Sequence, residues 1–169
     1  MSNIIIREAE PKDDARIGEL LIHAFIATYA RKMPTVVYGD ARKAELRDVA
    51  IKRARATVLV ADIGGEIVGT VSIFKPKAPT SEAWLPHFAD LRHLAVDPSF
   101  HGKGVSGPLL DRAEAIARDE WKTDGICLHV RRGADGVARL YQNRGFLRDP
   151  SGDISKPTVF LEAYYLRFD

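Results

Sequence analysis

Hydrophobic positions in the first third of the chain predict one strand and two helices. The β-branched run at residues 3–7 is typical of a strand, and the acidic, turn-prone stretch at residues 10–14 is typical of a helix start. Apolar residues then recur at helical spacing and form one face: Ile17, Leu20, Leu21, Ala24 and Phe25. The pattern breaks at Met33-Pro34, and residues 41–54 predict a second helix.

The middle of the chain predicts three strands. Residues 57–61 and 67–74 are strand-like runs on either side of Gly64-Gly65, a pair that supplies the positive φ angles of a hairpin turn. The prolines in residues 75–87 predict a loop. Residues 90–96 predict a further strand, which stops at Asp97-Pro98.

The last part of the chain continues this mixture of helices and strands. A helical stripe follows a glycine-rich turn and consists of Leu109, Leu110, Ala113, Ile116, Ala117 and Trp121. Residues 125–130 predict a buried strand, and a helix from Asp135 ends at Gly145. Strands follow at Phe146 and over residues 158–166. The order of elements predicts one α/β domain over residues 1–169.

Composition narrows the class of protein. A length of 169 residues fits a single core, and 46% hydrophobic with 28% charged residues excludes disordered, collagen-like and coiled-coil chains. The net charge of +2 is too small to indicate a nucleic-acid partner. The single cysteine, Cys127, excludes an internal disulfide and multi-cysteine metal sites and favours a reducing compartment. Without a long apolar run or a signal-peptide pattern, we expect a cytoplasmic protein with no membrane partner.

Candidate chemistry gathers where the strand ending at Val96 meets the helix beginning near Ser106. Glycines at positions 102, 104 and 107 leave backbone N–H groups open to the close approach of an anion, and the helix dipole adds about half a positive charge there. Lys103 contributes a cation. The turn therefore favours a phosphate or diphosphate ligand; a tight turn without a ligand is the alternative.

The same glycines match the spacing of the dinucleotide-binding fingerprint, but their context does not. That motif directly follows a strand and is paired with an acidic residue about 20 positions further on. Here five residues separate Val96 from Gly102, and Arg131-Arg132 follow the next strand. The chain also lacks the flanking strands and the catalytic motifs that a kinase-type glycine loop requires. We therefore do not expect nicotinamide or ATP binding.

Two motifs make the chain resemble the GNAT superfamily of N-acetyltransferases. The first is Leu94–Pro98 followed by residues 101–106, which match Gln/Arg-x-x-Gly-x-Gly/Ala except that His101 and Ser106 replace its first and last residues. The second is residues 138–146, with the pattern Ala-x-x-Tyr-x-x-x-Gly-Phe. Ala134 stands where the family usually has asparagine. The resemblance covers nearly the whole chain.

This resemblance implies a single-domain GNAT fold with a mixed, mostly antiparallel sheet of about six to seven strands flanked by about four helices. The strands ending at Val96 and Val130 would splay apart to hold acetyl-CoA, a co-substrate used without a metal. Its pantetheine arm would pair with the first strand and its diphosphate would rest on the glycine turn. The residues implied in CoA binding are Leu94, Ala95, Val96, His101, Gly102, Lys103, Gly104, Val105, Ser106, Gly107, Ala138, Tyr141 and Arg144.

Acetyl transfer to an amine requires a base. An alkylamine with a pKa of about 10.4 is almost fully protonated at pH 7, and only the neutral form is nucleophilic. The resemblance assigns the base to Asp90, four residues before Leu94 and on the same strand face. Asp90 could instead simply start the strand or pair with Arg92, and Glu82 and His93 are then the reserve bases, with His93 on the opposite face of the strand.

Two further roles follow from the resemblance. The Leu94 amide would stabilise the oxyanion, and Tyr141 would protonate the leaving thiolate. Packing beside Val137 and Leu140 is the alternative role for Tyr141. Buried Cys127 is not expected to be a nucleophile, because nothing near it in sequence would lower its pKa.

The resemblance thus implies an N-acetyltransferase that moves the acetyl group of acetyl-CoA to a primary amine, on a small molecule or a peptide, through a ternary complex. Two alternatives stay open: a CoA-binding regulatory module that has lost catalysis, suggested by His101, Ser106 and Ala134, and an acyltransferase for a longer acyl group. Members of the family often dimerise, so the resemblance makes a homodimer plausible for this chain. The acceptor pocket would involve Tyr29, Arg31, Lys32, Tyr38, Lys77, Glu82, Trp84 and His87, whose mixed charges select no acceptor.

Overall fold

The computed structural model describes residues 3–27 and 39–169 and divides into two compact units. The first unit is Met1–Ile73 with His93–Ala113, and the second is Phe74–Arg92 with Glu114–Asp169. Strand β4 (Phe88–Val96) passes from the second unit into the first. The division therefore does not follow a linker, and a single domain over residues 1–169 stays a prediction.

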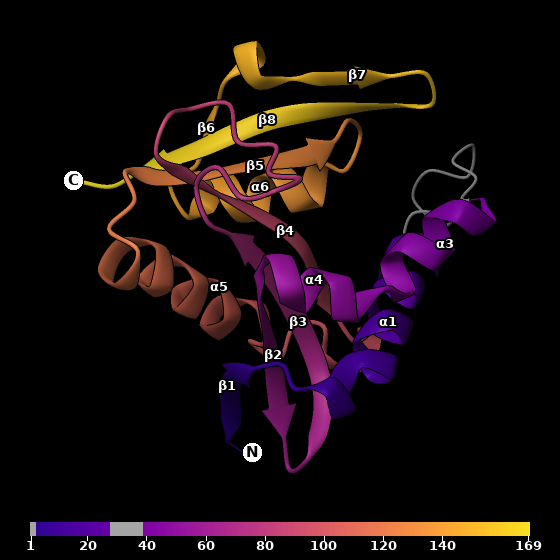
Figure 1. The fold of residues 1–169 in the computed structure, drawn as a ribbon. Helices are drawn as coiled ribbons and strands as arrows, with labels where there is room; N and C mark the ends of the chain where they lie inside the picture. The colour runs from indigo at the N-terminus through magenta and orange to yellow at the C-terminus, as the bar shows by residue number, and fades with distance from the viewer. Residues whose placement is uncertain (1–2, 28–38) are drawn as a thin grey trace. The chain divides into compact units, whose positions relative to one another are not determined.

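The strands of the first unit follow the order β1-β2-β3-β4, of which β4 belongs to this unit only from His93 onward (Figure 1). β1 (Ile4–Glu8) and β2 (Thr57–Ile63) pair antiparallel, as do β2 and β3 (Glu66–Phe74). The predicted hairpin turn is confirmed, because Gly64 and Gly65 have φ angles of 60° and 90°. Asp62 fixes the turn by accepting a hydrogen bond of 2.7 Å from the Gly65 amide.

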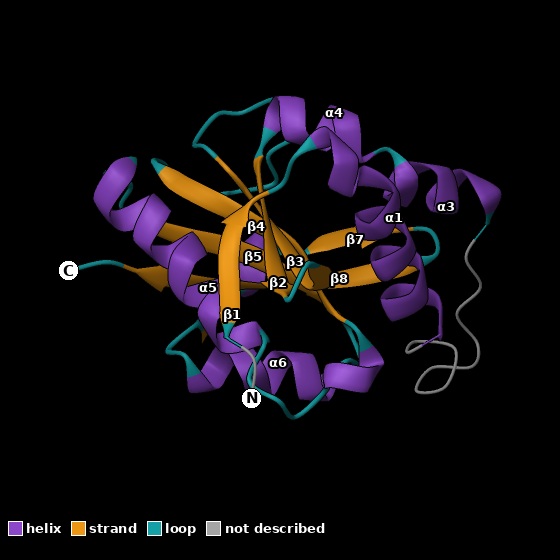
Figure 2. Ribbon diagram, turned by 90° about the horizontal axis from the view of Figure 1, so that it is seen from below, coloured by secondary structure: helices purple, strands orange, loops and turns teal. Residues whose placement is uncertain are grey.

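Helices pack on both faces of these strands. A 3₁₀ turn, η1 (Pro11–Asp13), leads into α1 (Asp14–Ile22), which continues as a π-helical turn, η2 (His23–Ala27). α1, α3 (Asp40–Arg47) and α4 (Val49–Arg55) share a core with the strands, made of Ile17, Leu20, Leu21, Leu46, Val49, Val58, Val60, Ile67 and Ala95. Figure 2 shows α5 (Ser106–Ala115) on the other side of β2 and β3, where a Cβ on Gly69 would lie 2.8 Å from Val105.

One predicted helix is wrong in extent. Residues 41–54 form two helices, because the backbone of Asp48 leaves the helical region with φ −81° and ψ 64°. The Asp48 carboxylate then caps α4 by accepting from the Ile51 amide at 3.5 Å. Aspartate favours such a cap over an interior helical position because its side chain competes for backbone donors.

The second unit is built around β8 (Val159–Arg167). β5 (Gly125–Arg131), β6 (Leu147–Arg148) and β7 (Ile154–Lys156) all pair antiparallel with it. The start of β4 pairs parallel with β5, over Phe88–Leu91 and Gly125–Leu128. The remaining elements are a π-helical turn, η4 (Ile116–Glu120), α6 (Asp135–Asn143) and a 3₁₀ turn, η5 (Pro150–Gly152).

The predicted fold class is confirmed, with two corrections in number. The described strands total eight, where six to seven were expected, because the three-residue β7 has no recognisable sequence pattern. The described α-helices total five, because of the break at Asp48. Gly145 ends α6 as predicted, with a φ angle of 98°.

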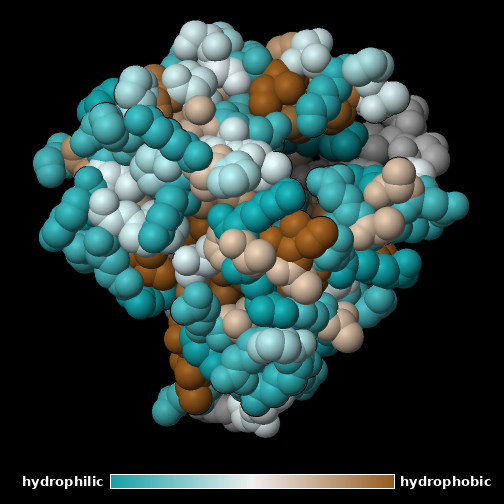
Figure 3. Space-filling model, in the orientation of Figure 1, coloured by the Kyte–Doolittle hydropathy of each residue, from teal (hydrophilic) through white to brown (hydrophobic). Residues whose placement is uncertain are grey.

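The surface is largely polar in the view of Figure 3, and a strip of hydrophobic residues follows β1. Ile5 of this strand is 58% exposed. Among the described parts of the chain, no helix has the length and apolar character needed to cross a bilayer.

Candidate functional site

The glycine-rich turn lies in the first unit between η3 (Pro98–Phe100) and α5. Gly102 and Gly104 both have a φ angle of 76°, a left-handed conformation that side chains disfavour. A Cβ added at Gly102, Gly104 or Gly107 would meet nothing within 4 Å, so the backbone there is open. Because α5 begins at Ser106, its first amides have no acceptor within the helix and carry the positive end of its dipole. This arrangement can bind an anion.

The side chains of His101 and Lys103, in the glycine-rich turn, contact residues that shortly precede them in the sequence. His101 Nε2 lies 3.1 Å from the carbonyl oxygen of Val96, and Lys103 Nζ lies 5.2 Å from the centre of the Phe100 ring. Val105 is buried, and its side chain lies against Gly69 of β3. His101 and Lys103 remain exposed, and a phosphate could therefore reach both of them.

Strand β4 contains a left-handed residue where the sequence predicts regular alternation. His93 has a φ angle of 58°, and its ring meets the Phe25 ring edge to face at 6.1 Å between centroids. A left-handed residue interrupts the alternation of faces along a strand. Because His93 lies between them, Asp90 and Leu94 need not share a face although they are four residues apart. Histidine in this conformation has no sequence signal that could have been recognised.

Asp90 is fully buried in the second unit and uses only one of its carboxylate oxygens. Oδ2 accepts from the Glu82 amide at 2.8 Å and from Arg92 Nε at 2.8 Å, and it lies 2.7 Å from Arg92 Nη2. Oδ1 accepts no hydrogen bond from any described residue. Leaving a buried carboxylate oxygen unsatisfied is costly, so a water, an ion or a reacting group is expected to supply the missing donor.

Burial sets the acidity of this region. It raises the pKa of Asp90 above the ordinary carboxyl value, and Arg92 and the Glu82 amide only partly oppose that effect. Cys127, which pairs with Asp90 across β4 and β5, has its pKa raised to about 11, mainly by burial. The thiol therefore stays protonated, which supports the interpretation of Cys127 as a small buried hydrophobe.

The residues predicted on the last helix lie in the second unit as well. Tyr141 is buried, and its ring meets the Phe146 ring edge to face at 5.5 Å between centroids. Ala138 is half-buried on the same helix. Arg144 forms an ion pair with Glu114, so a CoA phosphate would have to compete with this carboxylate. Leu94 and the glycine turn belong to the first unit, whereas Asp90, Tyr141 and Arg144 belong to the second.

The predicted loop at residues 75–87 is fastened at Trp84, which sequence reasoning gave no structural role. Trp84 Nε1 donates to Asp149 Oδ2 at 2.8 Å, and the indole meets the His129 ring at 5.2 Å between centroids. His129 Nε2 lies 2.8 Å from the Gly152 carbonyl oxygen, so this histidine links β5 to η5. Lys77, Glu82 and His87 lie in the same loop. The remaining predicted acceptor residues lie outside the described residues: Tyr29, Arg31, Lys32 and Tyr38.

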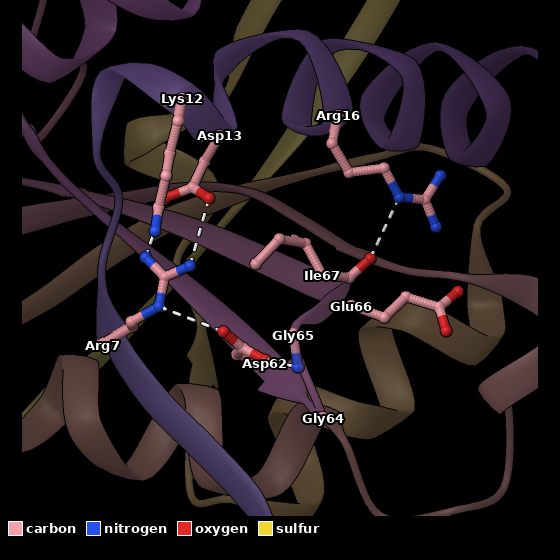
Figure 4. Close-up of a pocket in the computed structure, with 9 residues that line it drawn as sticks. All are labelled: Arg7, Lys12, Asp13, Arg16, Asp62, Gly64, Gly65, Glu66 and Ile67. Atoms are coloured by element: carbon pink, nitrogen blue, oxygen red, sulfur yellow. Dashed lines mark hydrogen bonds and ion pairs between the residues drawn. The ribbon is translucent and has the colours of Figure 1, made fainter.

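A cavity of about 610 Å³ in the first unit contains none of the predicted site residues (Figure 4). Arg7 crosses it and contacts Asp13 at 2.8 Å and Asp62 at 3.3 Å. Arg16, on its rim, donates to the Ile67 carbonyl at 3.1 Å and pairs with Asp97. These charges are matched to one another, so the network fastens β1 and α1 to the hairpin.

In residues 3–27 and 39–169, no three or more histidine, cysteine, aspartate or glutamate side chains are grouped so as to hold a metal ion.

Comparisons with known proteins agree on one family. The model of the acetyltransferase (GNAT) family matches residues 16–146. The curated protein "GCN5-related N-acetyltransferase 4, chloroplastic" from Arabidopsis thaliana is 26% identical, over 88% of this chain and 63% of its own length. The chain thus spans about three fifths of that relative.

Solved structures share the fold across almost the whole chain. An acetyltransferase of the GNAT family from Staphylococcus aureus matches with a TM-score of 0.74 and 18% identity, over 98% of this chain and 99% of that one. The putative acetyltransferase yncA from Salmonella typhimurium, solved with acetyl-CoA, matches with a TM-score of 0.66 and 24% identity, over 99% of this chain and 95% of that one. The PaiA N-acetyltransferase from Thermoplasma acidophilum, solved with coenzyme A, matches with a TM-score of 0.69 and 18% identity, over 95% of this chain and 98% of that one.

Proposed function

The chain belongs to the GNAT acetyltransferase family, and we propose that it transfers the acetyl group of acetyl-CoA directly to a primary amine within a ternary complex. The observation that carries this proposal is Asp90, a fully buried carboxylate with one oxygen that no described residue satisfies. Such an oxygen can receive a proton from a reacting amine, directly or through a water.

The donor site is proposed at the glycine turn and the end of β4. The open backbone at Gly102, Gly104 and Gly107 fits a diphosphate, with Lys103, His101 and the amides of Val105 and Ser106 around it. Leu94, Ala95 and Val96 would pair with the pantetheine arm, since the pairing of β4 with β5 ends at Leu91 and Leu128. Acetyl-CoA in the yncA structure and CoA in the PaiA structure support this choice of donor.

The chemistry is divided among three residues of this chain. Asp90 takes the proton that the amine loses, and its raised pKa brings it closer to neutral pH, which suits a general base. The Leu94 amide donates to the oxyanion formed when the amine attacks the thioester carbon. As the carbon–sulfur bond breaks, Tyr141 donates its phenolic proton to the sulfur. The products are an N-acetylated amine and CoA with its free thiol.

Calorimetric titration with acetyl-CoA tests the donor site. We expect binding by the wild type and a loss of affinity of about a hundredfold or more in Gly104→Glu, because a carboxylate in the turn repels the diphosphate. Gly64→Glu is the matched control, because Gly64 also has a positive φ angle and open space around it but lies in the hairpin. Equal losses in both variants, or no binding by the wild type, would contradict the proposed site.

A further inference from the structure

Arg92 joins the buried carboxylate of Asp90 to the loop Lys75–His87. Its guanidinium contacts Asp90 Oδ2 through Nε and Nη2, and Nη2 also donates to the carbonyl oxygen of Thr80. Nε lies 3.4 Å from Glu82 Oε1, and the guanidinium carbon lies 4.7 Å from the centre of the Phe74 ring. The Arg92 side chain is only 19% exposed, and all of these partners belong to the second unit.

The loop that Arg92 holds has an unusual backbone. Lys77, Thr80 and His87 have φ angles of 64°, 68° and 60°, although none of them is glycine. A β-branched residue such as Thr80 is rare in the left-handed region, and such strain persists only where the surroundings fix it. Two hydrogen bonds fasten the loop close to Thr80: Arg92 to the Thr80 carbonyl, and the Glu82 amide to Asp90.

The same contacts decide which oxygen of Asp90 is available. All of the donors converge on Oδ2, and Oδ1 is left without a partner among the described residues. The charged groups that influence Asp90 are Arg92 from β4 and Glu82 from the loop, and Glu82 is in turn 4.0 Å from Lys156 of β7. Across β5 the group facing Asp90 is the neutral thiol of Cys127. Arg92 is therefore the cation beside this carboxylate.

We propose that Arg92 is a positioning residue that couples the acceptor loop to the base: it turns Asp90 so that Oδ1 faces the reacting amine, and it holds Thr80 in its strained conformation. This inference rests on the proposed function, in which Asp90 is the base, and on the acceptor pocket that the family resemblance implies at the loop Lys75–His87. Arg92 itself touches neither substrate nor reacting atoms.

The test compares variants of Arg92 in the full chain. In Arg92→Gln, we expect the acidic limb of the kcat/KM profile to move up by about one pH unit, because the cation that favours the charged form of Asp90 is gone. We expect the acceptor KM to rise about tenfold as the Thr80 clamp is lost, with unchanged binding of acetyl-CoA. Arg92→Lys keeps the charge but not the two-point contact, so its pH limb should stay in place while KM rises.

A second substitution separates the loop from the charge. Glycine adopts the Thr80 conformation without strain, so Thr80→Gly in the Arg92→Gln background should restore the acceptor KM while the pH limb stays displaced. Arg148→Gln is the matched control, because Arg148 forms ion pairs with Asp153 and Glu162 at similar exposure in the same unit. It should move neither quantity. An equal effect in this control, or no effect in Arg92→Gln, overturns the proposal.

Hydrogen exchange distinguishes this inference from the proposed function. Exchange of the Glu82 amide, which donates to Asp90, should accelerate in Arg92→Gln whether or not the protein turns over. Absence of acetyl transfer by the wild type would overturn the proposed function and the base role of Asp90. Normal turnover with unchanged exchange and an unchanged pH limb in Arg92→Gln would overturn the coupling alone.

Discussion

At the scale of single residues, Asp90 is central to the proposed chemistry. Its type and its place four residues before Leu94 are visible in the sequence, but the unequal use of its two oxygens is not. Burying a carboxylate and leaving one oxygen unsatisfied costs about 1–3 kcal/mol, and functional sites are one place where natural proteins retain such a cost. The sequence could suggest a pair with Arg92; only the structure shows that the pair also holds the loop at Thr80.

Tyr141 is the proposed general acid, which protonates the leaving sulfur. We predict that Tyr141→Phe lowers kcat by about 10² to 10⁴ while the dissociation constant of acetyl-CoA stays nearly unchanged, because only the donated proton is removed. The matched control is Tyr164→Phe, since Tyr164 is another buried tyrosine of the second unit without a proposed role. Steady-state kinetics and calorimetry measure the two quantities. An unaltered kcat in Tyr141→Phe would exclude this residue from the reaction.

At the scale of elements, local patterns predicted most strands and helices, and interruptions were missed. The Gly64-Gly65 hairpin and the helix end at Gly145 follow from glycine's freedom at positive φ, which a sequence shows directly. The three-residue β7 pairs with β8 and left-handed His93 packs against Phe25, both distant in the chain, whereas the break at Asp48 is a local cap on the Ile51 amide. They could not be deduced from periodicity, which sees only runs of several residues.

The loop at residues 75–87 depends on close packing between Trp84 and Gly152. A Cβ on Gly152 would overlap the indole ring, so we predict that Gly152→Ala lowers the free energy of unfolding by about 1–3 kcal/mol. It should also raise the acceptor KM without changing acetyl-CoA binding. Gly39→Ala, where a Cβ meets nothing within 4 Å, is the control. Urea unfolding of both variants gives the comparison, and equal stabilities would contradict the packing argument.

The attachment of β1 and α1 to the hairpin should depend on pH. Hydrogen bonds from Arg7 lower the pKa of Asp13, so this carboxyl stabilises the fold above its unfolded pKa of about 3.9 and loses that effect as pH falls through the folded value. We predict that Arg7→Gln reduces the free energy of unfolding by about 1–3 kcal/mol at pH 7, and that its deficit shrinks below about pH 4. Urea unfolding across this range measures it; a deficit independent of pH would argue against the pair.

At the scale of the whole molecule, Cys127 reports on global opening. With a pKa of about 11, roughly one thiol in a thousand is ionised at pH 8, and the side chain is fully buried. We predict that Ellman's reagent labels the native protein slowly and that labelling accelerates as urea unfolds the chain. Rapid labelling of the folded protein would show that β5 opens locally and would contradict its place among the buried strands.

Acetyl transfer from CoA to an amine is the proposed function of the molecule as a whole. The most direct measurement incubates the protein with acetyl-CoA and a panel of primary amines, and follows both free CoA thiol and the mass of the acetylated product. We predict amine-dependent thiol release by the wild type and a rate about 10² to 10⁴ lower in Asp90→Asn, with Asp153→Asn close to wild type. Binding of acetyl-CoA without transfer to any amine would contradict the proposed acetyl transfer, and full activity in Asp90→Asn would contradict the base role of Asp90.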